Sequence, residues 1–259
     1  MYEKGGVYLK NAEYFMNRKT FMSILIGFLF CAIIWISPGS LSQAAFSENS
    51  ARVLIIDPGH GGEDGGAVSL DGTLECVINL DIAHKLKDLC DHMGIPSVLT
   101  HETNDLEYPE TAVTTAQRKR WDTRQRMELI NSFPNGYLLS IHQNIYPTPV
   151  PRGSQVLYGA GDASKEFGQL LHDNLVVSLD PSNRRVAMPA NRDIYIMAHA
   201  DCTAALVECG FLSHPEESVL LNTNSYKLKI AAVLAGSVLQ YWEDVDESQD
   251  SVLLHGVRQ

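Results

Sequence analysis

Short apolar runs alternate with longer amphipathic stretches from residue 53 to residue 242. The short runs, each ended by turn residues or polar residues, predict strands over 53–56, 97–100, 137–141, 155–158, 194–197 and 204–207. Apolar residues spaced three or four apart predict helices over 74–93, 115–132, 164–178 and 226–242. Strands that alternate with helices predict one α/β domain over residues 51–245, built on an open, mostly parallel or mixed sheet with helices on both faces. Residues 246–259 read as a polar, frayed tail.

The first 45 residues carry the pattern of an export signal. Residues 21–36 form an apolar run of 16 residues, preceded by Arg18 and Lys19 and followed by Pro38-Gly39 and a stretch of small residues. A basic flank, an apolar centre and small residues at the end are the marks of a secretory signal. Because the run falls just short of the roughly 17–25 residues that span a bilayer, both a cleaved signal peptide and a retained membrane anchor are open. The sequence therefore predicts an extracytoplasmic protein, secreted or membrane-anchored.

The charge balance limits the partners of this chain. Among 259 residues, 31 are acidic and 20 are basic, a formal net charge of −11. An acidic surface repels phosphate backbones, so the sequence predicts no binding to nucleic acid. The same charge disfavours adhesion to an acidic wall polymer, and no wall-binding repeat is visible. We therefore expect a membrane anchor or a protein partner to localise the domain.

Four cysteines follow the export segment: Cys76, Cys90, Cys202 and Cys209. No CxxC pair exists, which excludes a zinc ribbon. The domain is large enough to fold without disulfides, and we expect free thiols.

Polar groups that can bind a metal follow the predicted strands. His60 comes after the first strand, His142 ends the strand at 137–141, and Glu208 ends the strand at 204–207. Glu75 lies at the start of the first helix, which faces the same edge of the sheet. Ligands of open α/β sheets bind beyond the carboxyl ends of the strands, so these four side chains are expected to converge.

Two histidines and one carboxylate around an open position form a common catalytic zinc shell, and a second carboxylate beside it can act as a general base and acid. The same set could hold iron in an oxygenase, or serve a metallopeptidase. A wall-binding relative without activity is a third alternative. Alternatively, Glu75 could serve only to stabilise the amino terminus of its helix through the helix dipole. Metal binding by Cys76 or Cys209 is disfavoured, because neighbours in sequence point in different directions. The other histidines are interpreted as solvated: His84, His92, His101, His172, His199, His214 and His255.

Four motifs in this order resemble the zinc-dependent N-acetylmuramoyl-L-alanine amidases of the type 3 family, across residues 52–243. They are Ile56-Asp57-Pro58-Gly59-His60-Gly61-Gly62, Leu74-Glu75, Ser140-Ile141-His142-Gln143-Asn144 and Val207-Glu208-Cys209-Gly210-Phe211-Leu212-Ser213. The resemblance implies that His60, Glu75 and His142 bind zinc and that Glu208 is the catalytic carboxylate. It implies hydrolysis of the amide between N-acetylmuramic acid and L-alanine in peptidoglycan. Gln143, Cys209 and His214 depart from the family's usual residues.

Residues 117–126, with Ile130-Asn131, are similar to the germination-specific branch of this family, which acts in the spore cortex of endospore formers. That likeness implies a step toward muramic-δ-lactam, coupled to a muramic acid deacetylase. Another exported zinc metallopeptidase and a vegetative cell-wall autolysin remain as alternatives.

Overall fold

The fold is built on one six-stranded sheet, which the computed structural model describes within residues 52–256, with side chains to residue 248. The predicted signal or anchor segment lies outside the described residues. The strands are β1 (Leu54–Pro58), β2 (Ser97–Leu99), β3 (Tyr137–Asn144), β4 (Gln155–Tyr158), β5 (Met188–Pro189) and β6 (Thr203–Phe211). Their order is β2-β1-β3-β6-β4-β5. The strands β2, β1, β3 and β6 run parallel to one another, and β4 is antiparallel to β6. This arrangement confirms the predicted mixed sheet.

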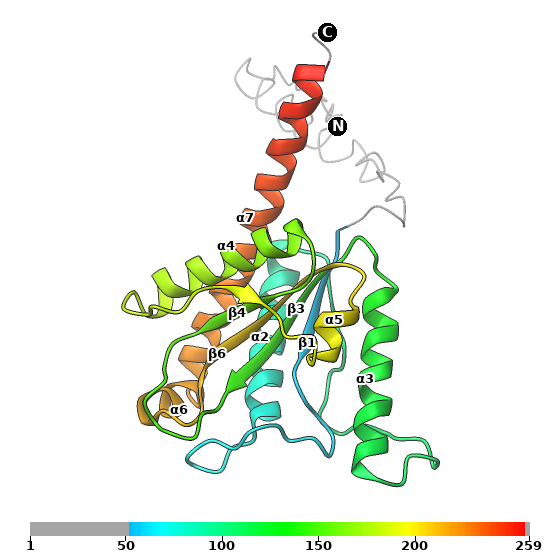
Figure 1. Ribbon diagram of the computed structural model, residues 1–259, viewed down its shortest axis with the longest axis vertical. Coiled ribbons are helices and arrows are strands. Elements are labelled where there is room, and N and C mark those ends of the chain that lie inside the picture. The colour runs from blue at the N-terminus through cyan, green and yellow to red at the C-terminus, as the bar shows by residue number, and fades with distance from the viewer. Residues whose placement is uncertain (1–51, 257–259) are drawn as a thin grey trace, which may run out of the picture. The chain divides into compact units, whose positions relative to one another are not determined.

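Helices cover both faces of this sheet, as the sequence predicts (Figure 1). Side chains of one strand alternate between the faces, so Leu54 and Ile56 pack in one core and Ile55 in the other. The larger core lies under α2 (Glu75–Met93), α4 (Asp162–Leu179) and α7 (Asn224–Gly256). The smaller one lies under α3 (Thr115–Asn131) and α5 (Tyr195–His199).

Local signals fix the ends of the two helices that border the site. α2 ends at Gly94, which adopts a left-handed φ of 72° that glycine allows without strain. α3 begins after Thr114, whose hydroxyl accepts from the Gln117 N–H while the Gln117 side chain accepts from the Thr114 N–H. This reciprocal capping box sets the start of α3 and the position of the basic residues that follow.

Four parts of the chain differ from the prediction. Residues 194–197 are predicted as a strand, but Ile194 caps the short helix α5 and residues 195–197 belong to it, because a four-residue apolar run has no period that separates strand from helix. The helix α6 (Pro215–Leu221) and the two-residue strand β5 were not predicted. The tail that was read as frayed continues α7 as far as Gly256, since no glycine or proline interrupts residues 243–255. Within residues 52–256, none of the helices contains an apolar stretch of the length needed to span a bilayer.

Two histidines for which the sequence predicts a solvated position are instead buried or half-buried. His172 is 2% exposed on α4, where its Nε2 bonds the carbonyl of Arg185 at 2.8 Å. His101 is half-buried, and burial together with the charge of Arg126 lowers its pKa to about 4. The prediction failed because each ring packs against segments distant in sequence. The four cysteines within the described residues are free thiols, as predicted.

Candidate metal centre

The four predicted site residues lie along one edge of the sheet, at or near the carboxyl ends of the parallel strands β1, β3 and β6 and at the start of α2. His60 follows β1, Glu75 is the first residue of α2, and His142 lies near the end of β3. His60 has a φ of 65°, the sole left-handed φ at a non-glycine residue between positions 52 and 256. An L-residue in this conformation costs about 1–2 kcal/mol, so the surrounding contacts must hold the turn.

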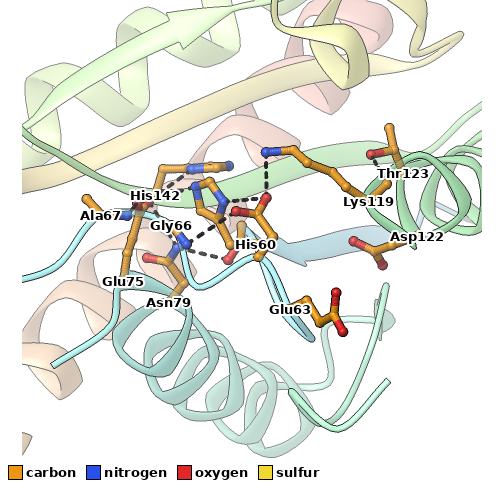
Figure 2. Close-up of polar contacts among 12 residues, drawn as sticks. His60, Glu63, Gly66, Ala67, Glu75, Asn79, Lys119, Asp122, Thr123 and His142 are labelled. Carbon is orange, nitrogen blue, oxygen red and sulfur yellow. Dashed lines mark hydrogen bonds and ion pairs between the residues drawn. The ribbon is translucent and has the colours of Figure 1, made fainter. Parts of the chain in front are cut away.

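His60, Glu75 and His142 point toward one another (Figure 2). Each offers one ligand atom, and these atoms lie within 4.8 Å of one another. His60 Nε2 is 3.3 Å from Glu75 Oε2, and His142 Nδ1 is 3.1 Å from Glu75 Oε1. The two imidazole rings meet edge to face, with centroids 5.0 Å apart. Glu75 therefore lies between the two histidines and faces both.

Two glycines leave the space that the three candidate ligand side chains fill. A Cβ on Gly66, which has a φ of +69°, would lie 2.6 Å from Glu75 Oε2 and 2.7 Å from His60 Cδ2. A Cβ on Gly59 would lie 2.3 Å from the His142 ring. The backbone thus approaches all three candidate ligands so closely that only glycine fits at these two positions.

Hydrogen bonds orient the Glu75 carboxylate. Its Oε2 accepts from the Ala67 N–H at 2.8 Å, and its Oε1 accepts from the Gln143 N–H at 2.9 Å. The buried Asn79 amide donates to Glu75 Oε1 at 3.3 Å and to the Gly59 carbonyl at 3.0 Å, and it accepts from the Gln143 amide at 3.1 Å. Burial alone would raise the pKa of Glu75, but His142 and His60 lower it well below the usual range, so the carboxylate is ionised.

Asp64 orients His60 from its other nitrogen. Asp64 Oδ2 is 3.0 Å from His60 Nδ1 and 2.6 Å from the Lys119 ammonium. Burial lowers the pKa of His60, but Asp64 and Glu75 outweigh it and raise that pKa to about 9. A carboxylate on the far nitrogen is the common outer partner of a metal-binding histidine, because it fixes the ring and raises its basicity.

Glu208 lies beside this group on the neighbouring strand. It pairs in register with His142 across the parallel strands β3 and β6. Since Ala204 and Leu206 pack under α3 and α5, the alternation of β6 directs Glu208 to that same face. Its Oε2 is buried and has no hydrogen-bond partner among the described residues. Burial raises the pKa of Glu208, the charge of Glu75 adds to this effect, and the nearby histidines and Arg185 oppose it.

A cavity of about 270 Å³ adjoins His60 and His142 between α3 and α5. Lys119 and Thr123 line it from α3, and Tyr195 and Ile196 line it from α5. A substrate can therefore reach the ligand group from the face on which Glu208 lies.

The donor set fits a borderline-soft divalent ion. Two imidazole nitrogens and one ionised carboxylate oxygen match the ligands of catalytic zinc sites, which use three protein ligands and leave one position open. Each donor also has an outer partner or a backbone contact that fixes its orientation. These three residues can thus hold a metal ion.

Comparisons with known proteins agree with this geometry. The family model described as N-acetylmuramoyl-L-alanine amidase, Amidase_3, matches residues 54–240, more than half of the chain. The chain belongs to the N-acetylmuramoyl-L-alanine amidase family. The amidase is 30% identical over 234 residues to the germination-specific N-acetylmuramoyl-L-alanine amidase of Bacillus subtilis, covering 86% of this chain and 94% of that one.

Solved amidase structures share the fold. The CwlD amidase from Clostridioides difficile, solved in complex with the GerS lipoprotein, has a TM-score of 0.70 and 33% identity over 74% of this chain and 98% of that one. The N-acetylmuramoyl-L-alanine amidase of Clostridium difficile 630 has a TM-score of 0.64 and 27% identity, over 75% and 98%. The enzyme is thus a hydrolase of peptidoglycan that cleaves the amide between N-acetylmuramic acid and L-alanine.

Sequence reasoning missed the residues that orient the candidate ligands. Asp64 lies four residues after His60, and Asn79 lies one helical turn after Glu75. The i, i+4 spacing of Glu75 and Asn79 on one helix was an available signal. Asp64 had none, because its contact depends on the turn that His60 makes.

Proposed function

We propose that this amidase is a zinc enzyme, in which His60, Glu75 and His142 hold the ion and Glu208 transfers protons. The observation that carries the proposal is the group of three ligand atoms within 4.8 Å, with an unpartnered buried carboxylate oxygen on the neighbouring strand. An ion-binding group and a separate acid–base group are the two parts that amide hydrolysis needs.

When bound, zinc in such a site lowers the pKa of a water molecule to about 7 and polarises a carbonyl. Glu208 accepts the proton that the attacking water loses and delivers it to the alanine nitrogen as that nitrogen leaves. Its raised pKa suits both transfers, since a carboxylate with the usual pKa would be a weaker base. A positioned general base and acid contributes roughly 10²–10⁴-fold to the rate.

Orientation of the ligands is the second contribution of the chain. Asp64 holds His60, while the Ala67 and Gln143 amides and the Asn79 side chain hold Glu75. Since each ligand is fixed before the substrate arrives, the reacting groups need little rearrangement.

Digestion of purified peptidoglycan tests this function. The assay scores the newly exposed amino groups of L-alanine. It compares three samples: wild-type protein, metal-stripped protein, and metal-stripped protein with one equivalent of zinc. We expect release from the first and third samples and none from the second. Equal release from the stripped sample would refute the zinc proposal, and cleavage between two amino acids would indicate a peptidase.

We further propose that the enzyme acts in the spore cortex, on the step that precedes formation of muramic-δ-lactam. The similarity to a germination-specific amidase, over 94% of that protein, supports this role. Purified cortex treated with this enzyme and a muramic acid deacetylase should yield lactam by mass spectrometry, and either enzyme alone should not. Lactam from the deacetylase alone would contradict the coupling, and activity on vegetative wall only would favour an autolysin.

The proposed location is extracytoplasmic, with a protein partner or a membrane anchor that brings the acidic domain to the wall. The Clostridioides difficile neighbour was solved with a lipoprotein, which supports a partner of that kind. Sedimentation of the purified enzyme with peptidoglycan tests this idea. Weak binding is expected, and tight binding without any partner would remove the reason for it.

A further inference from the structure

Arg126 of α3 is the most enclosed cationic side chain near the candidate metal centre. It is 3% exposed and borders the cavity that adjoins His60 and His142. An arginine at this place has two possible roles. It can bind the substrate, or it can hold the protein's own backbone.

The hydrogen bonds of Arg126 distinguish these roles. A guanidinium has five N–H donors. Nε donates to Asp122 Oδ1 at 3.0 Å, and Nη2 pairs with Asp122 Oδ2 at 2.8 Å. Nη1 donates to the Pro58 carbonyl at 2.7 Å and to Asp57 Oδ1 at 3.3 Å, and Nη2 also donates to the His60 carbonyl. All five donors are used within the protein, so none remains for a substrate.

Three of these contacts fall on the turn that carries His60. The carbonyls of Pro58 and His60 and the carboxylate of Asp57 all accept from Arg126. His60 holds a left-handed φ of 65°, a conformation that persists in an L-residue only where its surroundings impose it. The planar guanidinium fixes two carbonyls of this turn at once.

The network also reaches the strand of the second histidine. Asp57, which is fully buried, accepts from the Ser140 hydroxyl at 2.6 Å and from the Thr100 hydroxyl at 2.8 Å. Ser140 lies two residues before His142 on the same face of β3. Arg126 and Asp57 therefore connect the His60 turn to the strand that positions His142.

We propose that Arg126 is a positioning residue, which imposes the backbone conformation of His60 and thereby sets the geometry of the metal ligands. This inference rests on the proposed zinc site. Lysine cannot replace Arg126, because a single ammonium does not reproduce a planar fork that bonds two carbonyls and two carboxylates.

The test compares Arg126→Lys and Arg126→Gln with the wild type and with a control, Arg124→Gln, at an exposed position on the same helix. Zinc affinity of metal-free protein is measured by competition with a chromophoric chelator, at a temperature where each variant is folded. Both Arg126 variants should bind zinc about 10–100-fold more weakly, the usual loss when an outer partner of a metal ligand is removed. The control should match the wild type.

A second readout needs no metal. The Gly61 N–H donates to the Asp64 carbonyl at 2.8 Å, and the Gly62 N–H donates to the Asn104 carbonyl at 3.0 Å. If Arg126 holds the turn, both amides should exchange hydrogen faster in the Arg126 variants of the metal-free protein, and amides of β6 should not. A merely structural role would lower thermal stability and leave zinc affinity and the exchange at these two amides unchanged.

The outcomes separate the inference from the function on which it rests. Wild-type protein that binds no zinc would refute the zinc proposal, while the exchange of Gly61 and Gly62 would still decide the role of Arg126. Folded Arg126 variants with unchanged zinc affinity and exchange would overturn the inference. If the Arg126 variants do not fold, Asp122→Asn replaces them, because it weakens two of the five hydrogen bonds of Arg126. This variant should bind zinc several-fold more weakly than the wild type. Unchanged zinc binding would overturn the inference.

Discussion

Substitution of Gly66 by alanine should damage the metal centre more than the fold. Gly66 has a φ of +69°, and an alanine there pays about 1–2 kcal/mol for the left-handed conformation. The new Cβ would also lie 2.6 Å from Glu75 Oε2 and 2.7 Å from His60 Cδ2, and such overpacking costs about 1–3 kcal/mol more. Because the clash falls on two of the proposed metal ligands, we expect zinc affinity to fall about 10–100-fold as well.

Gly72 provides a matched control in the same connection between β1 and α2. Its φ is +91°, and a Cβ there meets nothing within 4 Å. Gly72→Ala should therefore lower the free energy of unfolding by the backbone cost alone, about 1–2 kcal/mol. Chemical denaturation and zinc titration of both variants give the comparison. Equal zinc affinity in Gly66→Ala and Gly72→Ala would refute the assignment of His60 and Glu75 as ligands.

Three further predictions address the charges of the site. Glu208→Gln should keep its zinc and lose about 10²–10⁴-fold in kcat. The same substitution should raise the melting temperature of the metal-free protein at neutral pH, because burial disfavours the Glu208 charge. Metal analysis, turnover and calorimetry measure these effects, and an active variant would remove Glu208 from the mechanism. Zinc competes with the proton on His60, whose pKa is raised to about 9, so zinc affinity should rise with pH up to about 9 and then level off; affinity independent of pH between 6.5 and 9 would contradict that ligand. The stability that protonated His60 gives the metal-free protein is fully present below its usual pKa of 6.5 and is lost as pH rises through about 9. The melting temperature should therefore fall over this interval, and the fall should be smaller in Asp64→Asn.

The convergence of the candidate ligands was predictable because the sheet brings distant residues together by a simple rule. His60 and His142 are 82 positions apart, but each lies at or near the carboxyl end of a buried apolar strand, and parallel strands end at one edge. Which carboxylate binds the metal and which transfers protons did not follow from the strand pattern. The family resemblance supplied that choice, and it remains a proposal for Glu75 and Glu208.

The orienting residues were not predictable in the same way. Arg126 stands among several basic residues of α3, and its local sequence does not distinguish it from them, yet its guanidinium is buried beside the His60 turn. Only the packing of α3 against β1 and its turn creates these contacts. By contrast, α6 had local signals that were overlooked: Pro215 at its first turn, with Glu216 and Glu217 behind it.

Anomalous diffraction at the zinc edge, from crystals of the zinc-loaded enzyme, locates the bound ion. We expect one ion bound to His60, Glu75 and His142, with Glu208 nearby but not coordinated. An ion bound elsewhere, or coordination by Glu208 in place of Glu75, would contradict it.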